Sequence, residues 1–254
     1  MANEATTVLE ETPQKPRARR PFVASEDVPA FKTELVAALA EQGLPLSTSQ
    51  VAALASHYCL LGEANNQFNL TRLIAPAEAV RWHYLDILAA LPYLTALAVE
   101  GTNGKLVRWV DVGSGGGFPG LVLAVACPNW HFILAERRAK KAAFLQHCVE
   151  ELALGGRVQV FAGDFEPGTV NRALKLCNVD VSRETLGLLG RAVEDGQRKL
   201  PRLLAVPVFV RAAFWLGRGD AQSLAKHLPP KWKIQQQHLL PTGNCRTVIV
   251  LVRE

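Results

Sequence analysis

Residues 109–120, WVDVGSGGGFPG, place an acidic residue and three alternate glycines directly after an apolar run. Gly113, Gly115 and Gly117 let the backbone adopt positive φ and come close to a small molecule. The valine-rich apolar run fits a buried parallel strand, and Pro119 fits the first turn of a helix, where its missing N–H costs nothing. The segment therefore predicts a strand-to-helix turn that binds a ligand.

Several ligands bind to glycine turns of this kind, and the spacing separates them in part. Gly115, Gly117 and Gly120 satisfy the dinucleotide pattern G-x-G-x-x-G, although this register starts late relative to the strand end. A Walker phosphate loop is excluded because no Gly-Lys-Ser/Thr follows at the required spacing. Asp111, two positions before the first glycine, makes the turn resemble the first motif of S-adenosylmethionine-dependent methyltransferases.

Two further strand ends carry residues suited to a nucleoside. The apolar run 131–135 ends in Glu136, and a carboxylate leaving the second strand of an α/β sheet can accept hydrogen bonds from ribose hydroxyls. A solvated acid at a helix start is the alternative. The third run, 157–161, leads to Asp164 and Phe165. This acid and aromatic pair could bond and pack against an adenine, and an ordinary loop is the alternative.

The elements that position these strand ends follow from the periodicity of the sequence. A helical pattern covers 28–97, in which Ser47 or Thr48 caps a second helix and Pro76 starts a third. Strand and helix signals then alternate, which predicts a parallel sheet with helices on both faces. We predict strands at 106–112, 131–135, 157–161, 186–190 and 206–214, a helix at 137–154, and an antiparallel hairpin of 234–240 and 247–252 around the turn residues 241–244.

We predict three parts along the chain: a disordered tail (1–27), a helical N-terminal segment (28–100) and a ligand-binding α/β domain (101–254). The 254 residues, 49% of them hydrophobic, suffice for one large domain core. No apolar stretch has the length of a membrane span and no signal peptide is recognisable, so we expect a cytoplasmic protein, and we expect a monomer. The five cysteines form no C-x-x-C pair, so we expect no metal site.

Positive charge is concentrated in the last third of the chain. The net charge is +5, and residues 191–233 contain nine Lys or Arg against three Asp or Glu. Such a surface can attract phosphate backbones and steer association with nucleic acid, and a solvated basic face is the alternative. The candidates for a nucleic-acid approach surface are the cations and planar side chains Arg191, Arg211, Trp215, Arg218, Lys231 and Trp232.

Four motifs within residues 60–166 together resemble one family. They are FNLT at 68–71, HYLD at 83–86, DVGSGGGFPG at 111–120 and ERRAKKAAFL at 136–145. The chain is similar to the RsmG (GidB) family, which methylates N7 of a guanine in small-subunit (16S) ribosomal RNA with S-adenosyl-L-methionine. The resemblance implies a class I S-adenosylmethionine-dependent methyltransferase fold, a Rossmann-like α/β sheet with a helical N-terminal segment and a C-terminal antiparallel hairpin. It also implies the small-subunit ribosomal RNA, or the ribosomal subunit, as partner.

The resemblance assigns roles to individual residues as well. By similarity, Gly113 and Phe118 line the cofactor pocket, Glu136 binds the ribose, and Asp164 and Phe165 flank the adenine. Arg191 in GRAV matches an arginine in the family's S-R-A motif, and we expect it to act in catalysis as well as in cofactor binding. The expected cofactor-binding set is Asp111, Gly113, Ser114, Gly115, Gly117, Phe118, Glu136, Asp164, Phe165 and Arg191.

The chain departs from the family pattern on the expected substrate side. Trp82 and Ile87 replace a basic residue and a serine around HYLD, and Leu216 stands where a lysine is expected. Residues 193–195 replace small and aromatic ones. These departures keep open a homologue that binds the cofactor or ribosomal RNA without methyl transfer. A nicotinamide-dependent oxidoreductase also stays open, because it would share the glycine turn and Glu136.

His83 and Asp86 lie three residues apart, on one face of an expected helix. They either border a substrate cleft beside Asn69 and Thr71, or tie the helical segment to the sheet. In neither interpretation does His83 or Asp86 have to act as a catalytic base for methyl transfer. Guanine N7 has a free lone pair and no proton, so methyl transfer to it requires alignment of the reacting atoms rather than proton abstraction.

Overall fold

The structure, a computed structural model, describes residues 21–99, 105–242 and 246–254. Residues 1–20 of the predicted tail and 243–245 of the predicted hairpin turn lie outside the described residues. The elements in chain order are α1 (Ala24–Glu41), α2 (Thr48–Gln67), α3 (Pro76–Ala79), the π-helical turn η1 (Val80–Leu85), α4 (Asp86–Leu88), α5 (Leu91–Val99), β1 (Leu106–Val112), α6 (Gly120–Ala126), β2 (His131–Glu136), α7 (Ala139–Glu151), β3 (Val158–Ala162), α8 (Val170–Leu176), β4 (Glu184–Arg191), α9 (Gly196–Leu204), β5 (Phe209–Leu216), α10 (Arg218–Lys226), β6 (Trp232–Leu239) and β7 (Thr247–Arg253).

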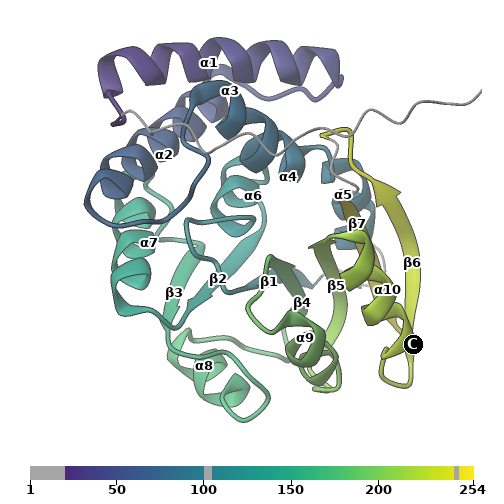
Figure 1. The fold of residues 1–254 in the computed structure, drawn as a ribbon. Helices are drawn as coiled ribbons and strands as arrows, with labels where there is room; N and C mark the ends of the chain where they lie inside the picture. Colours follow the sequence, from purple (N-terminus) through teal and green to yellow (C-terminus); the bar gives the residue numbers. More distant parts are fainter. Residues whose placement is uncertain (1–20, 100–104, 243–245) are drawn as a thin grey trace, which may run out of the picture.

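Seven strands form one sheet in the order β3-β2-β1-β4-β5-β7-β6 (Figure 1). Strands β1 to β5 are mutually parallel, whereas β7 runs antiparallel to both β5 and β6. The strand order reverses between β1 and β4, and ligands of open α/β sheets bind outside the carboxyl ends of the strands at such a switch point. The fold therefore predicts a ligand site at the loops after β1, β2, β3 and β4.

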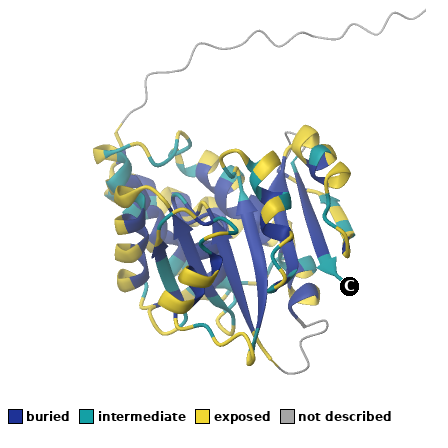
Figure 2. Ribbon diagram, turned by 90° about the horizontal axis from the view of Figure 1, so that it is seen from below, coloured by how far each residue is buried: buried dark blue, intermediate teal, exposed yellow. Residues whose placement is uncertain are grey.

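Alternate side chains of each buried strand supply two separate hydrophobic cores. Trp109 and Phe132 pack on the face covered by the N-terminal helices with α6 and α7. Val110 and Ile133 pack on the opposite face, which α8, α9 and α10 cover (Figure 1). Buried strands lie between helices whose outer surfaces are exposed (Figure 2). Within the three described ranges, no helix combines the length and apolarity needed to cross a membrane.

The helical segment begins earlier than its sequence pattern predicted. Helix α1 starts at Ala24, not at residue 28, and the backbone N–H of Val23 donates to Asp27 Oδ2 at 2.8 Å. The prediction missed this start because Val23 occupies the N-cap position, where Ser or Thr is the usual signal, and the cap contact is instead made by Asp27 from inside the first turn. Ser47 caps α2 with a complete capping box, as predicted.

The predicted strands are present with shifted ends. The fifth strand starts at Phe209 instead of residue 206, because residues 206–208 form a turn after α9. The helix predicted at 137–154 spans only Ala139–Glu151, and the helix after the glycine turn starts at Gly120, with Pro119 as its N-cap. In the hairpin, β6 starts two residues earlier and ends one residue earlier than predicted, and β7 ends one residue later.

Candidate functional site

The glycine turn connects β1 to α6 with a backbone that side chains rarely allow. Gly113, Gly115 and Gly117 have φ values of +74°, +56° and +90°. The backbone N–H groups of Gly113 and Ser114 both donate to the Ala135 carbonyl at the end of β2, at 2.9 and 3.1 Å. The turn is therefore held against the neighbouring strand by its own peptide groups.

Glu136 is fixed at the end of β2 by two backbone donors. The N–H of Gly115 donates to Oε2 at 3.0 Å and the N–H of Arg138 donates to Oε1 at 2.8 Å. The residue is only 6% exposed, yet its side chain lines a cavity. Because both oxygens keep further lone pairs, this carboxylate can also accept hydrogen bonds from a ligand's hydroxyl groups.

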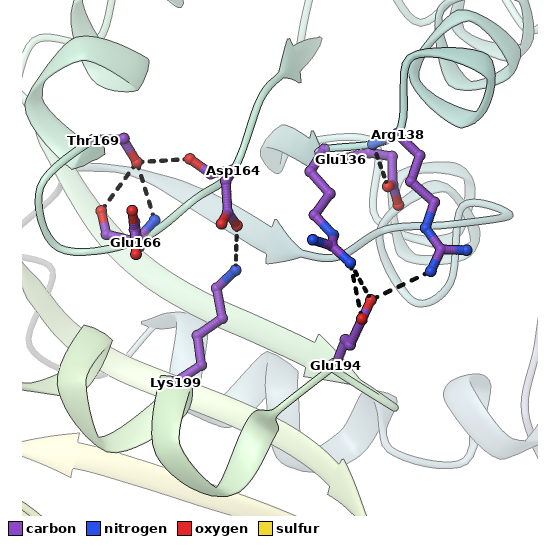
Figure 3. Close-up of polar contacts among 8 residues, drawn as sticks. Glu136, Arg138, Asp164, Glu166, Thr169, Glu194 and Lys199 are labelled. Atoms are coloured by element: carbon purple, nitrogen blue, oxygen red, sulfur yellow. Dashed lines mark hydrogen bonds and ion pairs between the residues drawn. The ribbon is translucent and has the colours of Figure 1, made fainter.

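The loop after β3 presents Asp164 and Phe165 to the same cavity. The Thr169 hydroxyl donates to the Asp164 carbonyl at 2.7 Å and accepts from the Glu166 N–H at 3.0 Å, which closes the loop (Figure 3). Lys199 Nζ from α9 donates to Asp164 Oδ1 at 2.5 Å. The Asp164 carboxylate is half exposed, whereas the Phe165 ring is buried.

These strand ends together enclose a cavity of about 230 Å³, which we call the glycine-turn pocket. A Cβ atom added at Gly113 meets nothing within 4 Å, so open space lies above this residue. A fixed carboxylate, open space above the glycines and one aromatic side chain fit an adenosine group. The pocket is lined by Val112, Gly113, Gly115, Ala135, Glu136, Arg137, Arg138, Lys141, Gly163, Asp164, Phe165, Ala192, Val193, Glu194 and Lys199.

Four residues predicted to contact the cofactor lie behind the turn instead. Asp111 is fully buried and its Oδ2 accepts the Gly120 N–H at 2.9 Å, while Ser114 donates to the Asp111 carbonyl at 3.0 Å. Phe118 stacks on His83 with ring centroids 4.5 Å apart. Gly117 faces Leu121, whose Cδ1 atom would lie 2.5 Å from an added Cβ. The four residues thus shape the turn and α6 and do not line the pocket, and their contact with the cofactor stays a prediction.

Burial changes the protonation of the groups behind the turn. Desolvation raises the pKa of the Asp111 carboxyl from its usual 3.8 to about 7, against the hydrogen bond from Gly120. Burial likewise lowers the pKa of His57 to about 4, so this imidazole is neutral near pH 7. Its Nε2 lies 2.9 Å from the Gly116 carbonyl and its Nδ1 2.9 Å from the Tyr84 hydroxyl. A neutral ring with its proton on Nε2 satisfies both contacts.

Asp86 is the centre of a buried ionic cluster that joins the helical segment to the sheet. Arg191 Nε and Arg246 Nη1 donate to its Oδ2 at 3.0 and 2.8 Å, and the Thr242 hydroxyl donates to Oδ1 at 2.9 Å. The indole N–H of Trp215 donates to its carbonyl at 2.9 Å. These contacts support the interpretation in which HYLD ties the two parts together.

Arg191 ends β4 and lines the β4–β5 cleft described below rather than the glycine-turn pocket. Its guanidinium, only 8% exposed, is paired with Asp86 and donates to the Trp82 carbonyl, and it does not line the glycine-turn pocket. His83 lies beside it, with Nδ1 at 3.5 Å from Nη1. Burial and then the charge of Arg191 lower the pKa of His83 to about 3. The prediction treated Arg191 as a free cation because its partner lies 105 residues earlier in the chain.

A larger cavity, of about 600 Å³, lies beside the glycine-turn pocket, and we call it the β4–β5 cleft. Ala192 and Val193 line both cavities. The strand order places the glycine-turn pocket over β1, β2 and β3 and the cleft over β4 and β5. The cleft is lined by Arg191, Ala192, Val193, Asp195, Gly196, Gln197, Arg198, Leu200, Trp215, Leu216, Gly217, Asp220, Leu224 and Arg246.

The predicted approach surface is only partly present. Arg211 and Trp232 are 3% and 5% exposed and line neither cavity, so the structure corrects their assignment as contact residues, whereas Trp215, although buried, lines the β4–β5 cleft. The Trp232 indole N–H donates to the Leu204 carbonyl in the core. Arg218 and Lys231 are exposed, as this prediction requires. Alternation along β5 and the hairpin points the other three side chains inward, a pattern that their types alone do not reveal.

Three ion pairs cross the mouth of the glycine-turn pocket. Glu194, after β4, accepts two hydrogen bonds of 2.8 Å from Arg137 and one of 3.4 Å from Arg138, both after β2 (Figure 3). The pair of Lys199 and Asp164 crosses beside it. The sequence analysis did not find these contacts. Thr169 had a detectable signal, since a threonine shortly after a strand-end Asp can close a loop, whereas Glu194 and Lys199 had none.

Comparison with known proteins identifies the family. A family profile described as rRNA small subunit methyltransferase G matches residues 50–181, about half of the chain. The chain belongs to this family. The ribosomal RNA small subunit methyltransferase G of Cupriavidus necator is 42% identical over 125 residues, which cover 48% of this chain and 54% of that protein. The protein of that name from Burkholderia pseudomallei is 38% identical over 139 residues, or 55% and 56%.

The chain thus spans about half the length of the curated relatives it matches. A solved structure of the METTL16 methyltransferase domain superposes with a TM-score of 0.51 at 14% identity, covering 89% of this chain and 92% of that one. This likeness and the sheet order confirm the predicted class I, Rossmann-like methyltransferase fold. Family and fold imply a cofactor of the S-adenosylmethionine type. In the described parts of the chain, no cluster of three or more His, Cys, Asp or Glu side chains is arranged to hold a metal ion.

Proposed function

We propose that this protein transfers a methyl group from S-adenosyl-L-methionine to N7 of a guanine in small-subunit ribosomal RNA. The observation that carries the proposal is the glycine-turn pocket, in which a backbone-held carboxylate faces open space above glycines, in a chain of the rRNA small subunit methyltransferase G family. We expect the protein to act as a monomer on the ribosomal subunit in the cytoplasm.

The cofactor would be held by the strand ends. Glu136 accepts hydrogen bonds from the ribose hydroxyls, Asp164 accepts one from the adenine amino group, and Phe165 supplies an apolar edge. Gly113 and Gly115 leave room for the rest of the molecule. When bound, S-adenosylmethionine supplies an electrophilic methyl group on a sulfonium sulfur.

The acceptor would occupy the β4–β5 cleft, which adjoins the glycine-turn pocket and shares with it the wall formed by Ala192 and Val193. The cofactor would supply its methyl group to the N7 lone pair, with S-adenosylhomocysteine as the leaving group, and no residue would need to move a proton. The chain's residues therefore contribute by alignment and by excluding water, which can supply much of the rate enhancement. Arg191 acts as a positioning residue, because its pairing with Asp86 fixes the strand end from which the wall extends.

A homologue without methyl transfer is the second candidate, motivated by the departures Trp82, Ile87 and Leu216. Leu216 lines the β4–β5 cleft where the family resemblance predicts a lysine. Because the proposed transfer needs no proton acceptor, loss of a lysine does not remove a required chemical step. We therefore favour the active enzyme, and the experiment below separates the two.

The test has a binding part and a transfer part. Calorimetry with S-adenosylmethionine, S-adenosylhomocysteine and NAD is expected to detect the first two ligands and not the third. Small ribosomal subunits from cells lacking the modification, incubated with protein and cofactor, are expected to gain one N7-methylguanine by mass spectrometry. Binding without any methylation would reject the enzyme and support the silent homologue. Binding of NAD alone would support an oxidoreductase.

A matched pair of variants links the activity to the pocket. Glu136→Ala is expected to weaken cofactor binding by about 1–3 kcal/mol, the usual cost of leaving polar partners unpaired. Glu34→Ala, at an exposed position on α1, is the control and is expected to bind like the parent. Equal binding by the two variants would place the cofactor elsewhere.

A further inference from the structure

The β4–β5 cleft carries a carboxylate on the side away from the glycine-turn pocket. Ala192 and Val193 line both cavities, and Asp220 lies in α10, which follows β5. Because β5 lies beyond β4 as seen from β1, a group in the cleft has the glycine-turn pocket on one side and Asp220 on the other.

Asp220 is held in place by a neighbour and keeps one oxygen available. Gln197 Nε2 from α9 donates to Asp220 Oδ1 at 2.8 Å. Across residues 21–99, 105–242 and 246–254, no hydrogen bond is made to Oδ2. An ionised carboxylate only accepts hydrogen bonds, so this rim recognises a donor.

The rest of the cleft suits a flat, partly apolar group. Val193, Leu200, Leu216 and Leu224 give it apolar surface, from three different elements and one loop. Leu216 adds to this surface where the family resemblance predicts a lysine. The volume of the β4–β5 cleft, about 600 Å³, lies in the range of small-molecule sites, which combine apolar walls with few polar groups.

We propose that Asp220 selects guanine as the methyl acceptor by accepting hydrogen bonds from its N1–H and N2–H₂ groups, with Gln197 positioning the carboxylate. This inference rests on the proposed function. In guanine these donors lie on the edge remote from N7. When N7 faces the cofactor, the donors therefore face Asp220. Adenine presents an acceptor at N1 and carries no 2-amino group, so the same carboxylate repels it.

The first test measures nucleobase preference without methyl transfer. Protein saturated with S-adenosylhomocysteine is titrated with GMP, IMP and AMP, and binding is followed by saturation-transfer NMR. The parent is expected to bind GMP best, IMP less well because inosine lacks the 2-amino group, and AMP least. Asp220→Asn replaces one acceptor oxygen by a donor and is expected to lose at least tenfold of the preference for GMP over AMP. An unchanged preference overturns the proposal.

The second test uses small ribosomal subunits that lack the modification. Asp220→Asn is expected to lower kcat/KM for methylation at least tenfold while the affinity for S-adenosylhomocysteine stays the same. Asp180→Asn, an exposed aspartate that lines neither cavity, is the matched control and is expected to behave like the parent. If the parent methylates and Asp220→Asn does so equally well, only the role of Asp220 is rejected. If the parent does not methylate, the proposed function fails, and the nucleotide titration still decides whether Asp220 selects guanine.

Discussion

The glycine-turn pocket and the β4–β5 cleft share the wall of Ala192 and Val193, but they are built by different means. Backbone groups and the carboxylate of a residue nearby in the sequence form much of the pocket: Gly115 and Glu136 are 21 residues apart. The cleft depends on the Asp86 cluster, whose members Arg191 and Arg246 lie 105 and 160 residues from Asp86. The pocket is thus a local product of consecutive strand ends, whereas the cleft is assembled only when the whole domain folds.

This difference predicts which substitutions affect ligand binding and which affect folding. A change in the glycine turn should alter ligand binding with modest effects on folding, because the turn is open towards the pocket. A change in the Asp86 cluster should alter folding and the acceptor side together, because buried charges lose their partners. The following variants test that separation, beginning with the largest expected effect.

Asp86→Ala is expected to lower the free energy of unfolding by about 3–5 kcal/mol, measured by urea denaturation, because it leaves two buried or half-buried arginines without their partner. Asp86→Asn keeps an acceptor for Thr242 and should lose less. A loss by Asp86→Ala below about 1 kcal/mol would show that Arg191 and Arg246 find other partners and that the cluster does not join the two parts.

Gly115→Leu is expected to weaken S-adenosylhomocysteine binding at least a hundredfold, about 2.7 kcal/mol, while circular dichroism still reports a folded protein; the φ of +56° at this position adds some backbone strain to the variant. An added Cβ meets only the Gly113 carbonyl at 3.7 Å and Lys141 Nζ at 4.0 Å, so the side chain extends into the pocket. Gly117→Ala is the contrast. Its Cβ collides with Leu121 at 2.5 Å, so it should destabilise the fold as well. Normal binding by Gly115→Leu would move the cofactor out of the pocket.

The same contrast explains what the sequence could and could not predict. The strands, the glycine turn and Glu136 were predictable because apolar runs, glycine spacing and strand-end acids are neighbours in the chain. The orientation of Asp111 was not predictable because a strand-end carboxylate can point forward to a ligand or back to a helix N-terminus, and only packing decides. The ion pair of Arg191 was not predictable because its partner is remote in the sequence. Asp220 had no sequence signal, since its role depends on the cavity around it.

A pH-dependent prediction tests the assignment of Asp111 to the interior. Its pKa is raised to about 7, so the folded state binds a proton more tightly than the unfolded state, and this contribution to stability is lost as pH rises from about 4 through 7. Asn does not titrate, so the stability of Asp111→Asn has no such pH-dependent contribution to lose. The melting temperature of Asp111→Asn relative to the parent is therefore expected to rise between pH 5 and pH 8, by the equivalent of about 1–3 kcal/mol. His57 and His83, whose pKa values are lowered, destabilise both proteins alike towards acid pH and cancel in this difference. A difference independent of pH would contradict the buried, proton-binding carboxyl.

The smallest expected effect belongs to the ion pair across the pocket mouth. Glu194 and Arg137 are 66% and 51% exposed, and exposed pairs contribute below about 1 kcal/mol. The two side chains must part if the cofactor's adenosine enters between them. Glu194→Gln is therefore expected to raise S-adenosylhomocysteine affinity by up to about fivefold at low ionic strength. The gain should disappear at about 0.5 M salt, because the Debye length is then short and the parent's ion pair is screened. Glu254→Gln breaks an equally exposed pair with Lys233, remote from both cavities, and should leave binding unchanged at every salt concentration. If Glu194→Gln weakens binding instead, Glu194 belongs to the bound state and the pocket closes over the cofactor, so that even this local site would depend on a contact between distant strand ends.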